Sequence, residues 1–246
     1  MKITISSILK KQIIALTGFL LSGFVAAHLL GNTMMFFGPE AFNGYAKKLM
    51  SLGPILYFME AGLVLFFLIH VGFTLALVVE NRKARPVAYK MAPSTKKRSI
   101  ATRIMPYTGI FIFAFTIYHL LDFKFNNHFG MVAGKVQEGL YGRVYEAFTD
   151  PLHSVLYILA ILAVSFHLTH AIQSMFQTFG LSSTKSHPLL TKISVTIGVI
   201  IAILFSSLPI FVIVKEKMAQ KPKVSDYKSS ENILYLTSME EMYDET

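Results

Sequence analysis

Histidines inside apolar segments are the residues of this chain with the clearest capacity for chemistry. The sequence contains eight histidines, and five of them lie within long apolar stretches: His28, His70, His119, His167 and His170. An ionisable side chain in such a stretch is costly in a membrane and therefore marks a functional candidate. A single histidine could simply hydrogen-bond a neighbouring helix, but neutral imidazole is also a good iron ligand. Because four separate segments each carry such a histidine, the pattern favours a cofactor site.

The positions of four histidines predict two pairs at two depths in a membrane. At 1.5 Å per helical residue, His28 and His119 each lie about 24 Å from the basic ends of their segments. By the same measure, His70 and His167 lie about 15–18 Å from that side. Two facing histidines would fill both axial positions of a haem iron, which suits electron transfer rather than ligand binding. The sequence therefore predicts two b-type haems stacked across the membrane.

An internal repeat supports this pairing. The segments TGFLLSGFVAAHLL and TGIFIFAFTIYHLL place Gly18 and Gly109 ten residues before His28 and His119. A repeat in the same orientation implies an approximate two-fold axis along the membrane normal, which would turn the members of each pair toward each other. Small residues in membrane helices usually serve helix packing, and at these two positions close approach of a porphyrin is the alternative.

His170 is an alternative ligand to His167. It follows His167 by three residues, so both side chains lie on nearly the same face of a helix. His170 could replace His167 on the iron, or it could hydrogen-bond a haem propionate on the cytoplasmic side.

Two acidic residues lie toward the outer histidine pair. Asp122 follows His119 by three residues, close to the end of its segment, which suits a buried structural partner. Glu60 lies deeper in the second segment and has apolar neighbours on both sides. A carboxylate at that depth is a functional candidate, and we hypothesise that Glu60 exchanges protons with a quinone.

Composition places the chain in the membrane class. Only 15% of its residues are charged and its mean hydropathy is +0.53, whereas about a quarter of a soluble domain is charged. A helix needs about 20 apolar residues to cross a bilayer. We therefore predict an all-α membrane protein of five transmembrane helices, the first four forming a haem-binding bundle from two parallel repeats. The predicted spans are 12–37, 54–79, 104–121, 151–179 and 189–214.

The cysteine count and the charge pattern exclude several classes of protein. The chain has no cysteine, which excludes thiolate-held iron–sulfur clusters, cysteine zinc sites and c-type haem attachment. The net charge of +9 could suggest nucleic-acid binding. The basic residues, however, lie between the apolar segments rather than on one face of a soluble domain, so nucleic acid is not an expected partner.

The distribution of lysine and arginine predicts the orientation. The N-terminus, the loop 82–103 and the connection 185–192 hold 13 of the 23 basic residues and lie on one side of the predicted membrane. Because positive residues mark the cytoplasmic side, we expect a cytoplasmic N-terminus and an external C-terminus. We expect a five-helix domain over 1–215 and an extracytoplasmic tail over 216–246.

Several linked motifs resemble one family. The runs ALTGFLLSGFVAAHLLGN, GPEAFNGYAKKL, LIHVGFTL, FTIYHLLDF and SFHLTHAIQSMFQTFG are similar to the di-haem cytochrome b subunit of succinate dehydrogenase and fumarate reductase. The resemblance implies a subunit of the bacterial cytoplasmic membrane that does not itself act on succinate. It implies a flavoprotein and an iron–sulfur subunit at the cytoplasmic face, and electron exchange with a membrane quinone, commonly menaquinone. The basic loop 82–103 would then dock these subunits, or it is only the positive-inside signal.

The resemblance also implies four haem ligands by position: His28 and His119 for the distal haem, and His70 and His167 for the proximal haem. His167 stands four residues before Ala171, where the family has a small residue, often glycine. This spacing favours His167 over His170.

Two other functions share some of these features. A di-haem anchor of another quinone-linked complex, of the hydrogenase or formate dehydrogenase type, would have the same haem pairs and different partners. A transporter that uses histidines for proton coupling would be colourless, and the paired depths argue against it.

Overall fold

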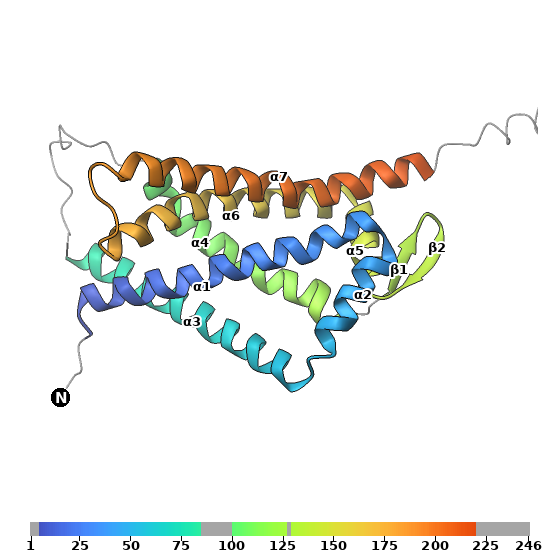
Figure 1. The fold of residues 1–246 in the computed structure, drawn as a ribbon, viewed down its shortest axis with the longest axis horizontal. Coiled ribbons are helices and arrows are strands. Elements are labelled where there is room, and N and C mark those ends of the chain that lie inside the picture. Colours follow the sequence, from blue (N-terminus) through green and yellow to red (C-terminus); the bar gives the residue numbers. More distant parts are fainter. Residues whose placement is uncertain (1–4, 85–99, 127–128, 220–246) are drawn as a thin grey trace, which may run out of the picture.

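Five long helices dominate the structure (Figure 1). The computed structural model describes residues 5–84, 100–126 and 129–219. Five helical stretches in these ranges are long and apolar enough to cross a membrane. The predicted all-α membrane fold with five spans is therefore confirmed. The long helices are α1 (Ser7–Thr33), α3 (Pro54–Lys83), α4 (Ile100–His119), α6 (Pro151–Thr178) and α7 (His187–Ala219).

Side-chain caps and prolines fix where these helices begin. The Ser6 hydroxyl accepts a hydrogen bond from a backbone N–H in the first turn of α1, at 3.2 Å. The Asp150 carboxylate caps α6 in the same way at 2.9 Å, and Pro151 occupies the first helical position. Pro54 likewise opens α3. Helices α3 and α6 therefore start at Pro54 and Pro151, where the predicted spans start.

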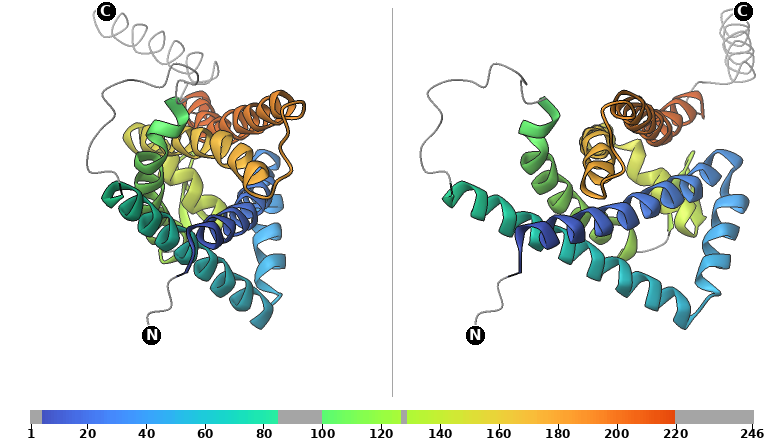
Figure 2. Two further views of the ribbon diagram at one scale, coloured as in Figure 1. Left: turned by 90° about the vertical axis from the view of Figure 1, so that its left-hand side faces the viewer. Right: turned by 60° about the vertical axis from the view of Figure 1, so that its left-hand side comes forward.

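Four of the long helices form a ring, and α7 packs outside it. Seen nearly along the helices (Figure 2, left), the ring runs α1, α3, α4, α6, and α7 lies against α6 and α1. Helices α1 and α4 run in one direction, and α3 and α6 run in the other (Figure 1). The α1–α3 pair therefore corresponds to the α4–α6 pair, as expected from the internal repeat. Diagonal positions in the ring belong to α1 and α4, and to α3 and α6.

One end of the bundle carries a compact cap that the sequence patterns did not predict. It lies where α1 and α7 end, on the right in Figure 1. Its two strands pair antiparallel, with Phe129 opposite Glu138. The cap consists of η1 (Met34–Phe37), α2 (Pro39–Met50), η2 (Leu120–Lys124), β1 (Phe129–Val132), β2 (Lys135–Glu138) and α5 (Leu140–Thr149).

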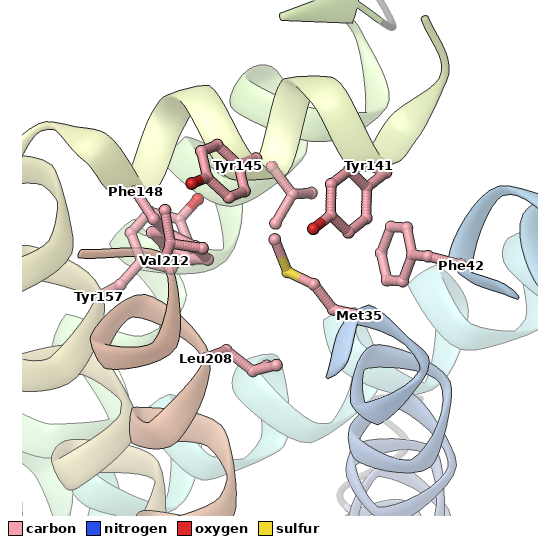
Figure 3. Packing of buried hydrophobic residues seen from close by; sticks show 9 residues of the cluster. Met35, Phe42, Tyr141, Tyr145, Phe148, Tyr157, Leu208 and Val212 are labelled. Carbon is pink, nitrogen blue, oxygen red and sulfur yellow. The ribbon is translucent and has the colours of Figure 1, made fainter. Parts of the chain in front are cut away.

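The best-buried large side chains lie between this cap and the bundle (Figure 3). Tyr141 and Tyr145 of α5 and Met35 of η1 are fully buried. They pack with Phe42 of α2 and with Val212 of α7 in one cluster. Since buried aromatic side chains contribute large apolar areas, this cluster fixes α5 to the ends of both α1 and α7.

Polar contacts also attach the end of α7 to the cap. Lys215 donates a hydrogen bond to the Tyr141 hydroxyl at 3.2 Å, and its ammonium lies 5.8 Å from each of the Tyr141 and Tyr145 ring centroids. The Tyr145 hydroxyl donates to the Glu216 carboxylate at 3.1 Å. Helix α7 continues to Ala219, so the first residues assigned to the tail are helical. The remainder of the tail, and most of the predicted basic loop, lie outside the described residues.

The Tyr145 contact predicts a loss of stability at alkaline pH. Burial raises the pKa of Tyr145 above its ordinary value of about 10, and the bond to Glu216 raises it further. The folded state therefore holds this proton more tightly than the unfolded state. Its stabilising contribution is complete below about pH 10 and is lost as the pH rises further.

We expect Tyr145→Phe to lose less thermal stability between about pH 9 and pH 11 than the wild type, measured by thermal unfolding in detergent. Tyr57→Phe is the control because the Tyr57 side chain is 70% exposed, and it should follow the wild-type curve. A Tyr145→Phe curve parallel to the wild-type curve would contradict the prediction.

Candidate functional site

His28 and His119 face each other across the helix ring. Their ring centroids are 5.7 Å apart and their planes are nearly perpendicular, at 89°. They come from α1 and α4, which lie diagonally opposite each other in the ring. If both imidazoles bonded one metal ion, two metal–nitrogen bonds of about 2 Å and the distance from each nitrogen to its ring centre would separate the ring centroids by about 6 Å. The spacing therefore fits the two axial positions of one iron.

Aromatic rings surround this outer pair. Phe24 stacks on His28 at 5.4 Å, and Phe205 of α7 lies 6.0 Å from the same ring. Phe123 lies 5.4 Å from the His119 ring. Such side chains exclude water from the imidazoles and offer flat apolar surfaces of the kind that a porphyrin contacts.

A hydrogen-bonded chain links His119 to the cap. The Tyr157 hydroxyl donates to the Asp122 carboxylate at 3.0 Å and lies 3.4 Å from His119 Nδ1. Because its hydrogen is already engaged, the Tyr157 oxygen is left to accept from His119. This arrangement puts the His119 proton on Nδ1 and leaves Nε2 with a free lone pair. Asp122 is buried and forms an ion pair with Arg143 of α5. Metal-binding histidines are commonly oriented by such bonds.

His70 and His167 are the predicted second pair, and each contacts a threonine of the neighbouring helix; His70 Nδ1 also bonds the Ile14 carbonyl, at 3.1 Å. Thr17 Oγ1 lies 3.2 Å from His70 Nδ1, and Thr108 Oγ1 lies 3.3 Å from His167 Nδ1. Each threonine donates its own hydrogen to a carbonyl one turn back, at 2.7 and 3.0 Å, so its oxygen accepts from the imidazole. In both imidazoles, Nε2 is left available for a metal.

Gly18 and Gly109 make room for these inner imidazoles. A Cβ atom at Gly18 would lie 3.1 Å from His70 Cε1, and one at Gly109 would lie 3.6 Å from His167 Cε1. Each glycine follows the threonine that bonds the same histidine. The two glycines thus face a histidine of the neighbouring helix and allow its ring to reach the threonine.

The two glycines predict different responses to the same substitution. Gly18→Ala introduces a contact tighter than ordinary van der Waals packing, so the His70 ring must shift by a few tenths of an ångström, whereas Gly109→Ala creates an ordinary contact. We expect Gly18→Ala to lower the free energy of unfolding by about 1–2 kcal/mol. Gly109→Ala should leave it unchanged or raise it by up to about 1 kcal/mol, because alanine favours a helix over glycine. Thermal unfolding of the two purified variants measures the difference. Equal stability of the pair would refute this account of the glycines.

Helix α3 leaves apolar surface uncovered by the rest of the described chain. Helix α3 is apolar along most of its length, yet none of its residues is buried by the rest of the described chain. It meets α4 through the stacked rings of Phe67 and Phe113, whose centroids are 5.8 Å apart. Apolar surface of this kind is covered either by lipid or by an apolar ligand.

The donor set suits haem better than a site built from protein ligands alone. Within the described residues, no group of three or more His, Asp or Glu side chains is placed to hold a metal ion. A haem iron needs only two side-chain ligands, because the porphyrin supplies the others. Paired imidazoles are therefore sufficient for haem and too few for a structural zinc site.

A known family matches the part of the chain that contains the second repeat. The model of the succinate dehydrogenase/fumarate reductase transmembrane subunit matches residues 78–206, just over half of the chain. The chain belongs to this family. The first repeat is related to the matched part by its duplicated sequence and by the equivalent Thr–His contacts. Comparison with curated proteins and with solved structures found no match.

In this member of the succinate dehydrogenase/fumarate reductase family, the two acidic candidates have different surroundings. Glu60 forms an ion pair with Lys124 at 2.5 Å, and the two side chains are 36% and 45% exposed. Asp122 is only 6% exposed and bonds Arg143 and Tyr157. The structure thus places Asp122 in the hydrogen-bonded chain to His119, and Glu60 in a separate pair at the surface.

His167 rather than His170 occupies the position equivalent to His70. His70 contacts Thr17 and faces Gly18. His167 contacts Thr108 and faces Gly109 in the same way. His170 lies about one turn farther along α6. The geometry therefore agrees with His167 as the candidate ligand in this anchor.

Sequence reasoning missed the three partners of Asp122. Arg143 and Tyr157 bond its carboxylate, and His153 Nε2 lies 3.1 Å from it. One signal was available, because His153 and Tyr157 are four residues apart and so share a helix face. Their rings stack at 4.6 Å. The contact with Arg143 joins separate elements and has no sequence spacing to reveal it.

Proposed function

We propose that this membrane anchor holds two b-type haems and carries electrons between an iron–sulfur subunit and a membrane quinone. His28 and His119 would hold the outer haem, and His70 and His167 the inner one. Each bound haem supplies reversible one-electron chemistry at its iron. The observation that carries the proposal is the repeated bond from imidazole Nδ1 to a hydroxyl, at His70, His119 and His167, which leaves Nε2 for iron.

The side chains around the pairs would set the conditions for electron transfer. Thr17 and Thr108 orient the inner imidazoles, and Tyr157 orients His119. Two histidines at each haem would leave no ligand position for oxygen or another small molecule, which suits electron transfer. Aromatic rings around the outer pair limit access of water. The two pairs would hold the two haems at different depths in the membrane.

Family membership supports partners that carry the succinate chemistry. The chain has no cysteine, so any thiolate-held iron–sulfur cluster of the complex belongs to another subunit. We place a flavoprotein and an iron–sulfur subunit at the end of the bundle where α1 begins, which the positive-inside rule makes cytoplasmic. The cap would then lie outside the cytoplasmic membrane of a bacterium, and menaquinone is the proposed quinone.

The purified complex tests this proposal. We expect reduced-minus-oxidised spectra with sharp low-spin b-haem bands, and haem extraction that gives two haems for each anchor chain. Mass spectrometry of the intact complex should show a flavoprotein and an iron–sulfur subunit. A colourless complex would eliminate the haem proposal, and hydrogenase or formate dehydrogenase subunits in the complex would eliminate the proposed partners.

A further inference from the structure

The hydroxyl groups that bond the two histidine pairs differ in their own acceptors. At the inner pair, the threonine hydroxyls bonded to His70 and His167 donate to backbone carbonyls, which are neutral. At the outer pair, the Tyr157 hydroxyl bonded to His119 donates to the Asp122 carboxylate. Hydrogen bonds to a charged partner are roughly twice as strong as those between neutral groups. The proton on His119 Nδ1 therefore belongs to a series of bonds that ends on a charge, unlike the protons of the inner imidazoles.

The Asp122 carboxylate is fixed between its partners. One of its oxygens accepts from the Arg143 guanidinium, and the other accepts from the Tyr157 hydroxyl. The oxygen that accepts from Tyr157 also lies 3.1 Å from His153 Nε2. Because Asp122 and Tyr157 are both buried, water screens the carboxylate poorly. In such a buried network, each hydrogen bond polarises the next.

This series of bonds reaches the nitrogen opposite the proposed iron-binding atom of His119. An imidazole whose Nδ1–H bonds toward an anion becomes more basic, and its Nε2 becomes a stronger donor to a metal. A stronger donor favours the oxidised state of an iron centre, and so does a poorly screened negative charge nearby. Both effects have the same sign. Together they would lower the affinity of the outer haem for an electron.

We propose that Asp122 and Tyr157 are positioning residues that lower the midpoint potential of the outer haem and leave that of the inner haem unchanged; the inference rests on the proposed electron-transfer function. Tyr157 transmits the effect of the Asp122 charge to the His119 imidazole, and Arg143 holds the carboxylate in place. Asp122, which the sequence predicts as a buried structural partner, thus also has an electronic role.

The first test removes the link and keeps the ion pair. In the purified complex, we expect Tyr157→Phe to raise the equilibrium constant for reduction of the outer haem about tenfold, which is about 59 mV for one electron. The inner haem should keep its wild-type potential. Redox titration followed at the b-haem absorption bands measures both values, and the outer haem is identified as the one that His28→Ala removes. An unshifted outer haem in Tyr157→Phe would overturn the inference.

Tyr118→Phe is the matched control for this variant. It removes a hydroxyl from the same cluster, but that hydroxyl bonds His153 Nδ1, at 3.0 Å, rather than His119. Both haems of Tyr118→Phe should therefore keep their wild-type potentials. A shift equal to that of Tyr157→Phe would mean that loss of any nearby hydroxyl has this effect, which would also overturn the inference.

Asp122→Asn tests the charge itself. The amide oxygen can still accept from Tyr157, but the negative charge is gone, so the outer potential should again rise. This variant also decides the matter if Tyr157→Phe does not retain the outer haem, and an unshifted potential in Asp122→Asn would then contradict the inference. A complex without haem would refute the proposed function, whereas two haems with unshifted potentials in these variants would refute only the role of Asp122 and Tyr157.

Discussion

Replacing His167 with alanine is expected to remove half of the haem from the purified complex, whereas His170→Ala is expected to retain all of it. His167 bonds Thr108 and faces Gly109, which matches the contacts of His70 with the first repeat. His167→Ala would leave the haem iron with one histidine instead of two, which should weaken haem binding severely. Haem extraction and redox titration of both variants measure the outcome.

The two variants control for each other because the histidines lie three residues apart on one helix. His70→Ala should reproduce the loss seen in His167→Ala, since both belong to the inner pair. His28→Ala and His119→Ala should instead remove the other haem. The haem that remains should then have a different midpoint potential from the one that remains in His167→Ala. Loss of haem in His170→Ala with full haem in His167→Ala would reverse the ligand assignment.

The second large effect is expected at Asp122. Its carboxylate is 6% exposed and pairs with Arg143, whose side chain is only 20% exposed. Asp122→Ala would leave a guanidinium largely buried without its counter-charge and would also remove the acceptor of Tyr157. Removing one partner of a buried pair costs about 3–5 kcal/mol, and the partial exposure of Arg143 reduces this to about 2–3 kcal/mol.

Thermal unfolding should therefore show a fall in Tm of several degrees for Asp122→Ala, on the order of 5–10 °C. Glu60→Ala is the comparison, because the Glu60–Lys124 pair is more exposed and such pairs contribute about 0–1 kcal/mol. The prediction fails if the two variants unfold at the same temperature. Asp122→Asn, which keeps an acceptor for Tyr157, should lie between them.

The long helices and the facing of His28 and His119 could be predicted because they depend on local patterns. The span starting at Pro54 followed from a run of apolar residues longer than a bilayer needs, and the helix extends from Pro54 to Lys83. Equal distances of His28 and His119 from their segment ends predicted a shared depth, because the rise of a helix is constant. Their facing arrangement in the structure, 5.7 Å apart, follows from that regularity.

The cap could not be predicted in this way because its stability comes from contacts between distant residues. Helix α5 has only 10 residues, and it is fixed where Tyr141 and Tyr145 meet Met35 and Val212. No period in the sequence connects these four positions. The same limit applies to Asp122, which was singled out as a buried partner while its counter-ion Arg143, on another element, was not.

The attachment of the cap to α7 has a consequence for the order of assembly. Helix α5 supplies Arg143, which begins the series of side-chain hydrogen bonds that reaches His119. Helix α5 is in turn fixed by Val212 and Lys215, near the end of the last helix. The inner pair depends only on helices that the ribosome delivers earlier. During synthesis the inner site can therefore form before α7 has been inserted, and the outer site reaches its final geometry only once the whole bundle is in the membrane.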